Sequence, residues 1–312
     1  MTELTTVSGV WALAAAALVI LLALVAASLD SALTARADGA GGARGALAAP
    51  LWEAARLMRQ RRRTLVAADT LLWRIGCTGP VVVALLMVAV VPLGRWTLLD
   101  LDVGVVWFNA MGVMMWALVW LAGWGPNSVH SLVGGYRFLA HGLGYELPLM
   151  FALVAPAIAA GSLRVGDVAA AQTHLWFVLW MPVAFVVYCV GVVAFSVWGS
   201  FAAALGVDIA GGVTAELSGV DRLVFQAGRY ALLAAGAAFA VPMFLGGGAG
   251  PLLPDWMWSV VKTVALLGLL VWLRRAIPAL RPDKFMEIGW VVLLPAVLAQ
   301  DLLVAVIAIW RS

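Results

Sequence analysis

The sequence has few charged residues and few reactive side chains. Only 11% of its 312 residues are charged, where a soluble domain of this length would carry about a quarter, and 64% are hydrophobic. This composition excludes a soluble globular protein and indicates an integral membrane protein. The net charge of +3 comes mostly from one loop, so it gives no indication of binding to nucleic acid.

Cysteine and histidine are too scarce to suggest a disulfide framework or a metal site. Cys77 and Cys189 both fall in apolar runs, where they suit the role of small core residues. The sequence also lacks a nucleotide-binding glycine motif between a strand and a helix, and it has no soluble stretch long enough for a redox centre. The chain therefore cannot carry electrons alone. Without an internal repeat of the kind many transporters show, a stand-alone transporter is the weaker interpretation.

Long apolar runs predict eight membrane-spanning helices. Each run is near the roughly 20 residues needed to cross a bilayer. The first is too long for a signal-peptide core and follows no basic residue, so we expect it to remain as a helix. We expect an all-α integral membrane protein in which residues 1–312 form a single transmembrane domain. The predicted spans are residues 8–29, 75–93, 104–122, 147–163, 174–196, 223–246, 257–273 and 288–309.

The distribution of arginine and lysine predicts how these helices are oriented. Basic residues concentrate in alternate connections, above all in the one between the first and second helices. Because basic loops stay on the cytoplasmic side, we expect loops 1, 3, 5 and 7 to be cytoplasmic. Both termini would then face outward from an inner (plasma) membrane. The 16 tryptophans cluster near predicted helix ends, as interfacial belts do.

The first loop contains a predicted amphipathic helix in the sequence LWEAARLMRQRRR. Its apolar residues Leu51, Ala55 and Met58 fall on one helical face. Two compatible interpretations stay open, which are anchoring to lipid headgroups of the bilayer and docking of a cytoplasmic partner. Both would use the charged residues of this helix and its end, which are Glu53, Arg56, Arg59 and Arg63.

The stretch from Gly123 to Leu163 begins as a polar, glycine-rich loop and ends as a membrane-spanning run. Glu146 stands where the apolar run begins, and a carboxylate there costs free energy, which indicates a purpose. Pro148 removes the helix hydrogen bond to the carbonyl of Gly144, so we expect a bent or locally opened helix with Glu146 near a cavity. We favour proton exchange at Glu146. An ion pair with Arg137 is the alternative, although their nine-residue separation puts them on opposite faces of a straight helix.

Two further charged residues lie deep in apolar runs. Lys262 and Asp301 would each cost on the order of 3 kcal/mol alone at mid-membrane. We therefore expect them to pair with each other, or Lys262 to face Glu216 or Glu146. His141 lies at a predicted helix boundary, where we expect a simple hydrogen-bonded histidine.

Three stretches carry a resemblance to a known family. The first runs from Gly123-Trp124-Gly125 to Tyr145-Glu146-Leu147-Pro148, the second is WLRRAIPALRPDKFMEIGW at 272–290, and the third is TAELSGVDRLVFQAGRY at 214–230. They resemble the H-subunit (subunit 1) family of respiratory complex I and its hydrogenase relatives. Lys262 also falls where that family carries a lysine.

This resemblance implies a membrane subunit that forms the quinone chamber at its junction with a hydrophilic arm. Such a subunit takes part in coupling quinone reduction to proton translocation. Iron–sulfur clusters and flavin would lie only on partner subunits, and the chain itself would hold no covalently bound cofactor. By the same likeness, the residues that line or flank the chamber would be Arg137, Glu146, Glu216, Arg274, Arg281 and Asp283.

The sequence departs from the family in the loop between helices 5 and 6. The family has an acidic loop there, whereas this chain reads AFSVWGSFAAALGVDI, with Asp208 as its one carboxylate. Clustered carboxylates hold protons near neutrality because like charges raise one another's pKa. The loss of that cluster favours a divergent member in a reduced complex. Two alternatives stay open, which are the membrane anchor of an energy-converting hydrogenase and a scaffold that has lost coupling.

Overall fold

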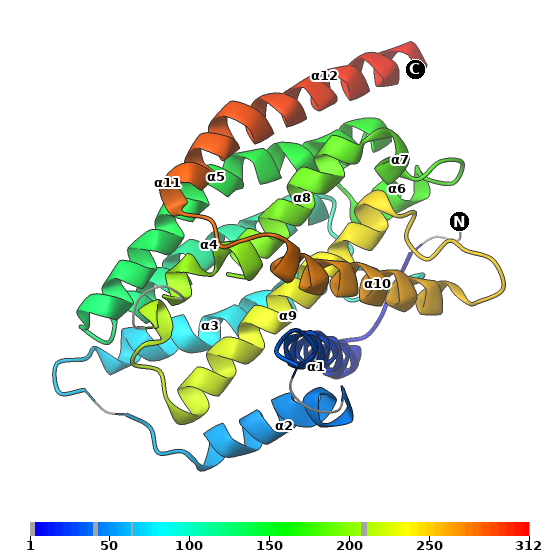
Figure 1. The fold of residues 1–312 in the computed structure, drawn as a ribbon. Coiled ribbons are helices and arrows are strands. Elements are labelled where there is room, and N and C mark those ends of the chain that lie inside the picture. The colour runs from blue at the N-terminus through cyan, green and yellow to red at the C-terminus, as the bar shows by residue number, and fades with distance from the viewer. Residues whose placement is uncertain (1–3, 40–42, 64, 207–210, 312) are drawn as a thin grey trace.

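The computed structural model describes residues 4–39, 43–63, 65–206 and 211–311, which form a bundle of helices (Figure 1). Within these residues, eight helices are long and apolar enough to cross a membrane, as predicted. The chain is thus an all-helical, multi-pass membrane protein. The spans are Trp11–Ala37, Thr70–Val88, Gly104–Trp124, Val129–Ala160, Pro182–Leu205, Gly219–Phe244, Asp255–Arg274 and Pro282–Trp310.

Short elements separate and extend these spans. In chain order the elements are β1 (Thr5–Thr6), α1 (Trp11–Ala37), α2 (Ala43–Arg59), α3 (Thr70–Val88), β2 (Trp96–Thr97), α4 (Gly104–Trp124), α5 (Val129–Ala160), α6 (Val165–Ala170), α7 (Phe177–Trp180), α8 (Pro182–Phe195), η1 (Gly199–Leu205), η2 (Gly212–Thr214), α9 (Gly219–Phe244), α10 (Asp255–Ala276), α11 (Pro282–Ile288), η3 (Gly289–Leu293) and α12 (Leu294–Arg311).

The fourth and fifth spans differ most from the prediction. The fourth begins at Val129 rather than at residue 147, so most of the stretch interpreted as a loop is the first half of a 32-residue helix. Its glycines permit this, because a side chain at Gly134 would lie 2.4 Å from the backbone nitrogen of Val213 in η2. The fifth span is broken into α7, α8 and the 3₁₀-helix η1. Pro182, at the first position of α8, has no amide hydrogen to continue the preceding turn.

The loops gather at two ends of the bundle. At one end, called here the strand end, β1 pairs in parallel with β2, and Arg164 forms a bidentate ion pair with Asp100. At the other end, called the α2 end, the amide of Leu280 donates to the carbonyl of Ser200. The even-numbered loops lie at the strand end with the N-terminal segment, as consecutive spans that cross in alternate directions require. Assignment of the α2 end to the cytoplasm stays a prediction.

The core is centred on α9, which packs against α1, α3, α8 and α10. Small residues let its neighbours approach closely, since a side chain at Gly228 would lie 3.0 Å from the backbone of Val81. Phe239 stacks on Phe108 of α4 with ring centres 3.8 Å apart. By contrast, α12 runs along the edge of the bundle (Figure 1), and only 17% of its span is buried.

Candidate functional site

Charged residues from distant parts of the chain meet at the α2 end in two groups. The first, called the loop cluster, is built on Glu216, which follows η2. Arg63 Nη1 lies 2.8 Å from Glu216 Oε2, and Ser128 Oγ donates to Glu216 Oε1 over 3.1 Å. The amide of Arg63 also donates to Ser218 Oγ over 2.6 Å. These contacts tie the segment after α2 to the start of α5 and the start of α9.

The loop cluster keeps its carboxylate ionised. The hydrogen bond from Arg63, with a smaller contribution from Ser128, lowers the pKa of Glu216 below its ordinary value. Burial acts in the opposite direction but is outweighed. A charged Glu216 is therefore a fixed link between three loops at neutral pH.

The second group, called the helix-end cluster, surrounds Asp30 near the end of α1. Arg274, at the end of α10, forms an ion pair with Asp30 Oδ2, and the hydroxyl of Tyr230 donates to the same oxygen over 3.3 Å. Asp30 Oδ1 is buried and has no hydrogen-bond partner among the described residues. The cluster thus joins α1, α9 and α10 and leaves one acceptor oxygen unused.

An indole ring forms one wall of the helix-end cluster. The guanidinium groups of Arg274 and Arg229 lie 5.0 and 5.7 Å from the centre of the Trp198 ring, in cation–π contact. Arg229 also donates to the carbonyl of Val197 over 2.5 Å. Val197 has φ of +54°, which is strained for a β-branched residue, so this hydrogen bond helps hold the turn.

The remaining predicted chamber residues lie apart from these clusters. Arg137 on α5 donates to the carbonyl of Ala203 in η1 over 3.3 Å. Arg281 and Asp283 pair with each other at 3.3 Å on the surface, with side chains 82% and 61% exposed. The structure therefore brings Glu216, Arg274 and the Arg281–Asp283 pair to the α2 end, where the pair's ionic contact is within itself. Asp208 lies outside the described residues.

Glu146 lies on α5, on the side that faces α4. The indole of Trp116 in α4 packs against Gly142, one turn before Glu146, where an added side chain would lie 2.6 Å from the ring. Both carboxyl oxygens of Glu146 are buried, and the polar side chains that act on them are Trp116 and Asn109 of α4, although no hydrogen bond of normal distance and angle is formed among the described residues. A buried carboxyl group without a charged partner is the feature expected of a proton-exchanging residue. No contact to Glu146 supports the alternative of an ion pair with Arg137.

Pro148 leaves α5 continuous, and the carbonyl that it frees is covered by protein. The carbonyl oxygen of Gly144 lies against Gly289, where an added side chain would be only 2.2 Å away. The indole of Trp290 donates to the neighbouring carbonyl of Leu143 over 3.0 Å. The short π-helix η3 thus fits against α5 at the turn weakened by proline. The cavity predicted beside Glu146 stays a prediction.

His141 is fully buried on α5 between aromatic rings. Its ring lies edge-on to Phe201 of η1 at 5.4 Å and to Phe285 of α11 at 5.9 Å. The backbone of Leu280 lies near enough to interact with the ring, although neither ring nitrogen makes a hydrogen bond of normal distance and angle in the described segments. A hydrogen-bonded histidine therefore stays a prediction, and the apolar loop and α11 surround the ring with phenylalanine.

The predicted pairing of Lys262 is also wrong. Lys262 Nζ donates to the carbonyls of Leu245, Gly247 and Ala249 over 2.7–2.8 Å and lies 4.2 Å from the centre of the Trp176 ring. These carbonyls follow the C-terminal end of α9, where the helix dipole favours a cation. All three ammonium hydrogens are therefore engaged without Glu216, Glu146 or Asp301.

Asp301 is left as a second unpartnered carboxylate. It is buried on α12, and neither oxygen is hydrogen-bonded to any described residue. The neighbouring side chain of Gln300 makes the polar contacts instead, to the amide of Val183 and the carbonyl of Trp180, both over 3.2 Å. Asp301 thus stays a candidate for protonation within the membrane.

The amphipathic helix is present as α2 and begins earlier than predicted, at Ala43. Leu57 anchors it to the bundle and is fully buried, while the predicted apolar face points outward, with Leu51 and Met58 exposed. Glu53 and Arg56 form an ion pair of 2.6 Å, and the hydrogen bond from Arg56 lowers the pKa of Glu53. An outward apolar stripe beside charged residues suits a helix that lies at a membrane surface.

Four residues of the helix-end cluster were not predicted as site residues. These are Asp30, Trp198, Arg229 and Tyr230. Asp30 could have been selected from the sequence, because it is a carboxylate at the end of the first apolar run. Trp198 offered no such signal, because it lies in the loop that departs from the expected acidic sequence.

Known proteins match the sequence over nearly the whole chain. Residues 8–305 match the protein family described as NADH dehydrogenase. The chain is 35% identical to the NADH-quinone oxidoreductase H subunit 2 of Geobacter sulfurreducens over 81% of this chain and 80% of that protein. It is 33% identical to the H subunit 1 of Geobacter metallireducens, over 84% and 83% of the two chains. Identity to the H subunit 2 of Cereibacter sphaeroides is 37%, over 70% and 69%.

Proposed function

Since the chain belongs to the H-subunit (subunit 1) family of NADH dehydrogenase, we propose that it is a membrane subunit of an NADH-quinone oxidoreductase-type complex. In this proposal its α2 end faces the cytoplasm and receives the iron–sulfur subunits, and other membrane subunits cover part of its lateral surface. Flavin and iron–sulfur clusters belong to those partners. The chain contributes one wall of the quinone chamber and part of the coupling path.

The observation that carries this proposal is the helix-end cluster. Arg229 Nε is a buried donor with no hydrogen-bond partner among the described residues, and Asp30 Oδ1 is a buried acceptor in the same condition. Buried polar groups are normally paired, so an unpaired donor and an unpaired acceptor in one cluster indicate a polar ligand. The carbonyl oxygen of a quinone head would accept a hydrogen bond from Arg229, and the hydroxyl group of the reduced quinol would donate one to Asp30.

These residues would hold and orient the quinone rather than react with it. The quinone would supply the redox chemistry when bound, accepting electrons from the partner subunits. Arg229 would donate a hydrogen bond to a carbonyl oxygen of the quinone, and Asp30 would keep Arg274 and Tyr230 in place. Glu146, with unpartnered oxygens on the α4 side of α5, would hold the proton that couples quinone chemistry to translocation.

Partner capture with chemical analysis tests the proposal. The tagged chain is purified in mild detergent, its partners are identified by mass spectrometry, and quinone is extracted and measured. We expect iron–sulfur subunits and quinone together, and Arg229→Gln should lower the amount of quinone while partners are retained. Iron–sulfur subunits with a nickel-containing subunit and no quinone would instead identify a hydrogenase anchor.

A scaffold without coupling is a second candidate, and η1 is the observation that favours it. The apolar segment fills the space where the family's acidic loop would lie, with Phe201 packed edge-on against Phe285 at 4.5 Å. Glu146→Gln distinguishes the two functions in the purified complex. Proton translocation should be lost in the coupling role and unchanged in the scaffold role. Glu287→Gln, which alters an exposed carboxylate paired with Lys284, serves as the matched control.

A further inference from the structure

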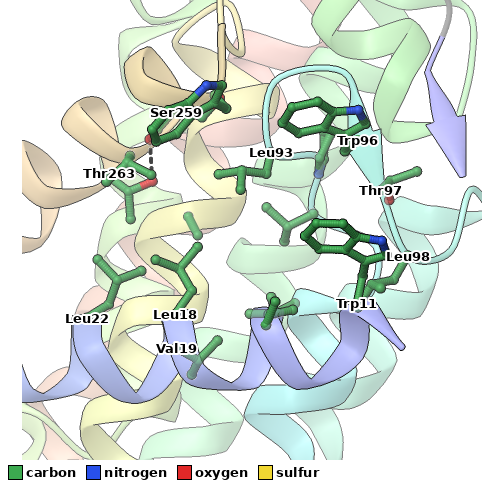
Figure 2. Close-up of a pocket in the computed structure, with 18 of the residues that line it drawn as sticks. Trp11, Leu18, Val19, Leu22, Leu93, Trp96, Thr97, Leu98, Ser259 and Thr263 are labelled. Carbon is green, nitrogen blue, oxygen red and sulfur yellow. Dashed lines mark hydrogen bonds between the residues drawn. The ribbon is translucent and has the colours of Figure 1, made fainter. Parts of the chain in front are cut away.

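A large apolar cavity opens at the strand end, away from the helix-end cluster. Its volume is about 500 Å³, within the roughly 300–1,000 Å³ of small-molecule pockets. Figure 2 shows that α1 contributes Leu18, Val19 and Leu22, while the turn before β2 contributes Leu93. Small residues of α9, including Ala234 and Ala238, form part of the wall. The cavity therefore lies among membrane-spanning helices, and its occupant must come from the bilayer.

The few hydroxyl groups in the cavity are already hydrogen-bonded. Ser259 Oγ donates to the carbonyl of Asp255 and accepts from the amide of Gly94, both over 3.1 Å. Thr263 donates to the carbonyl of Ser259 over 2.7 Å, and Thr97 donates to the carbonyl of Leu99 over 3.1 Å. The interior thus presents hydrocarbon and no free polar group from these side chains, which suits a saturated or isoprenoid chain rather than a polar ligand.

The rim of the cavity has the composition of a lipid headgroup site. Trp11, Trp96 and Trp256 line the cavity and are 60%, 40% and 42% exposed, as in the aromatic belts at membrane surfaces. Arg95 is exposed beside them, with its guanidinium group 5.5 Å from the centre of the Trp96 ring. Arg95 belongs to a neighbouring polar pocket, which also contains Arg164 and the carboxylates of Asp100, Asp167 and Asp255. It is the basic residue in contact with a rim tryptophan, and a lipid phosphate is the headgroup that it would bind.

A glycine holds this rim in place. Gly94 has φ of +63°, and a side chain there would lie 2.7 Å from the backbone nitrogen of Trp256. Residues Leu93 and Trp96 exchange backbone hydrogen bonds of 2.7 and 3.2 Å across the turn. The turn therefore packs against α10 and holds Trp96 at the cavity, with Arg95 next to its ring.

We propose that this cavity binds an acyl chain of a phospholipid whose phosphate contacts Arg95. The site is separate from the proposed quinone chamber, since it lies at the opposite end of the bundle and contains none of the helix-end cluster. An isoprenoid chain on an uncharged head would fit the interior but would make no use of the arginine. The contact of Arg95 with the rim residue Trp96 therefore favours phospholipid.

Photolabelling tests this proposal on the full chain. The protein is reconstituted in vesicles of phosphatidylethanolamine and phosphatidylglycerol that contain phosphatidylglycerol with a diazirine in its acyl chain. Labelled peptides are mapped by mass spectrometry, and labelling of the cavity segments is divided by labelling of the lipid-exposed face of α12. We expect residues 11–22 and 256–263 to be labelled in excess of that reference.

Two pairs of variants test whether the labelling comes from a lipid bound in the cavity. Ala15 lines the cavity whereas Ala17 is exposed and does not, so Ala15→Leu should reduce cavity labelling and Ala17→Leu should leave it unchanged. Arg95→Gln should reduce labelling about fivefold, the loss expected for one basic residue near a lipid phosphate. Arg36→Gln, at the α2 end, controls for the loss of a positive charge.

Each other outcome overturns the proposal. Equal effects of Ala15→Leu and Ala17→Leu would show that the labelling is ordinary contact with the bilayer. A loss with Ala15→Leu but none with Arg95→Gln would mean that the chain belongs to an uncharged lipid. Chromatography in mild detergent confirms that each variant is folded before it is labelled.

Discussion

The crossing of α5 and η3 gives the sharpest test of the fold. At this crossing the carbonyl of Gly144, which Pro148 deprives of its helix partner, lies against Gly289. A Cβ atom at position 289 would be 2.2 Å from that oxygen and 3.0 Å from the carbonyl carbon. Gly289→Ala should therefore destabilise the protein although it adds a single methyl group.

The magnitude follows from what the methyl group meets. Real Cβ atoms essentially never approach another atom closer than 3.0 Å, so the two segments must separate by at least about 0.8 Å. The obstacle is backbone rather than a flexible side chain, which leaves no rotamer to relieve it. Separation would also stretch the hydrogen bond from Trp290 to Leu143. We expect a loss of about 1–3 kcal/mol from overpacking and up to about 1 kcal/mol more from that hydrogen bond.

Gly268 supplies the matched control. It lies in the interior of α10, and an added Cβ there meets nothing within 4 Å. Gly268→Ala should be neutral or stabilising by up to about 1 kcal/mol through helix propensity. Thermal stability of both variants in mild detergent, with a detergent-denaturant titration for free energies, measures the difference. Equal stability of Gly289→Ala and wild type would refute the packing at this crossing.

Three further predictions follow from the polar contacts. Hydrogen bonding lowers the pKa of Glu216 from its ordinary value of 4.5, so the stabilisation by Arg63 is present above pH 4.5 and is lost as the pH falls through the lowered pKa. Glu216→Gln should remove this loss of stability at acid pH, which amounts to at most about 1 kcal/mol because the pair is partly exposed. Lys262→Met should destabilise by about 1–3 kcal/mol and should not rescue Asp301→Ala, with the two effects adding to within about 0.5 kcal/mol, as a double-mutant cycle would measure. In the same kind of cycle, Asp30→Asn and Arg274→Gln should show coupling of about 0.5–3 kcal/mol, and additive effects would exclude a direct ion pair.

Apolar length and basic residues were sufficient to predict the eight spans and the alternation of loops. Both depend on the bilayer, because its thickness sets the length of every spanning helix and basic residues concentrate in the loops on one side. Prediction failed where the tertiary structure decides the outcome. Glycines at 134 and 135 indicated a loop, yet close packing against η2 and α4 makes them part of α5. Helix propensity alone gives no weight to such contacts.

The polar site was predictable in composition but only partly in geometry. Position in motifs was enough to select Glu216 and Arg274, and the structure places both at the α2 end. Their partners could not be predicted, because Arg63 and Asp30 come from segments far away in the sequence. Lys262 shows the limit most clearly. Its ligands are backbone carbonyls, which every sequence contains and no side-chain pattern reveals.

The short pairing of β1 with β2 bears on the order in which the chain assembles. Thr5 donates to the carbonyl of Arg95, a residue synthesised 90 positions later, through both its amide and its hydroxyl. These atoms can meet only after α1 and α3 have both crossed the bilayer and their connecting segment has been retained on the far side. The time at which the Thr5 amide becomes protected from hydrogen exchange during synthesis would therefore report when the first two spans have been inserted. Protection of this amide would also show that the residues around the mouth of the proposed lipid cavity have been assembled.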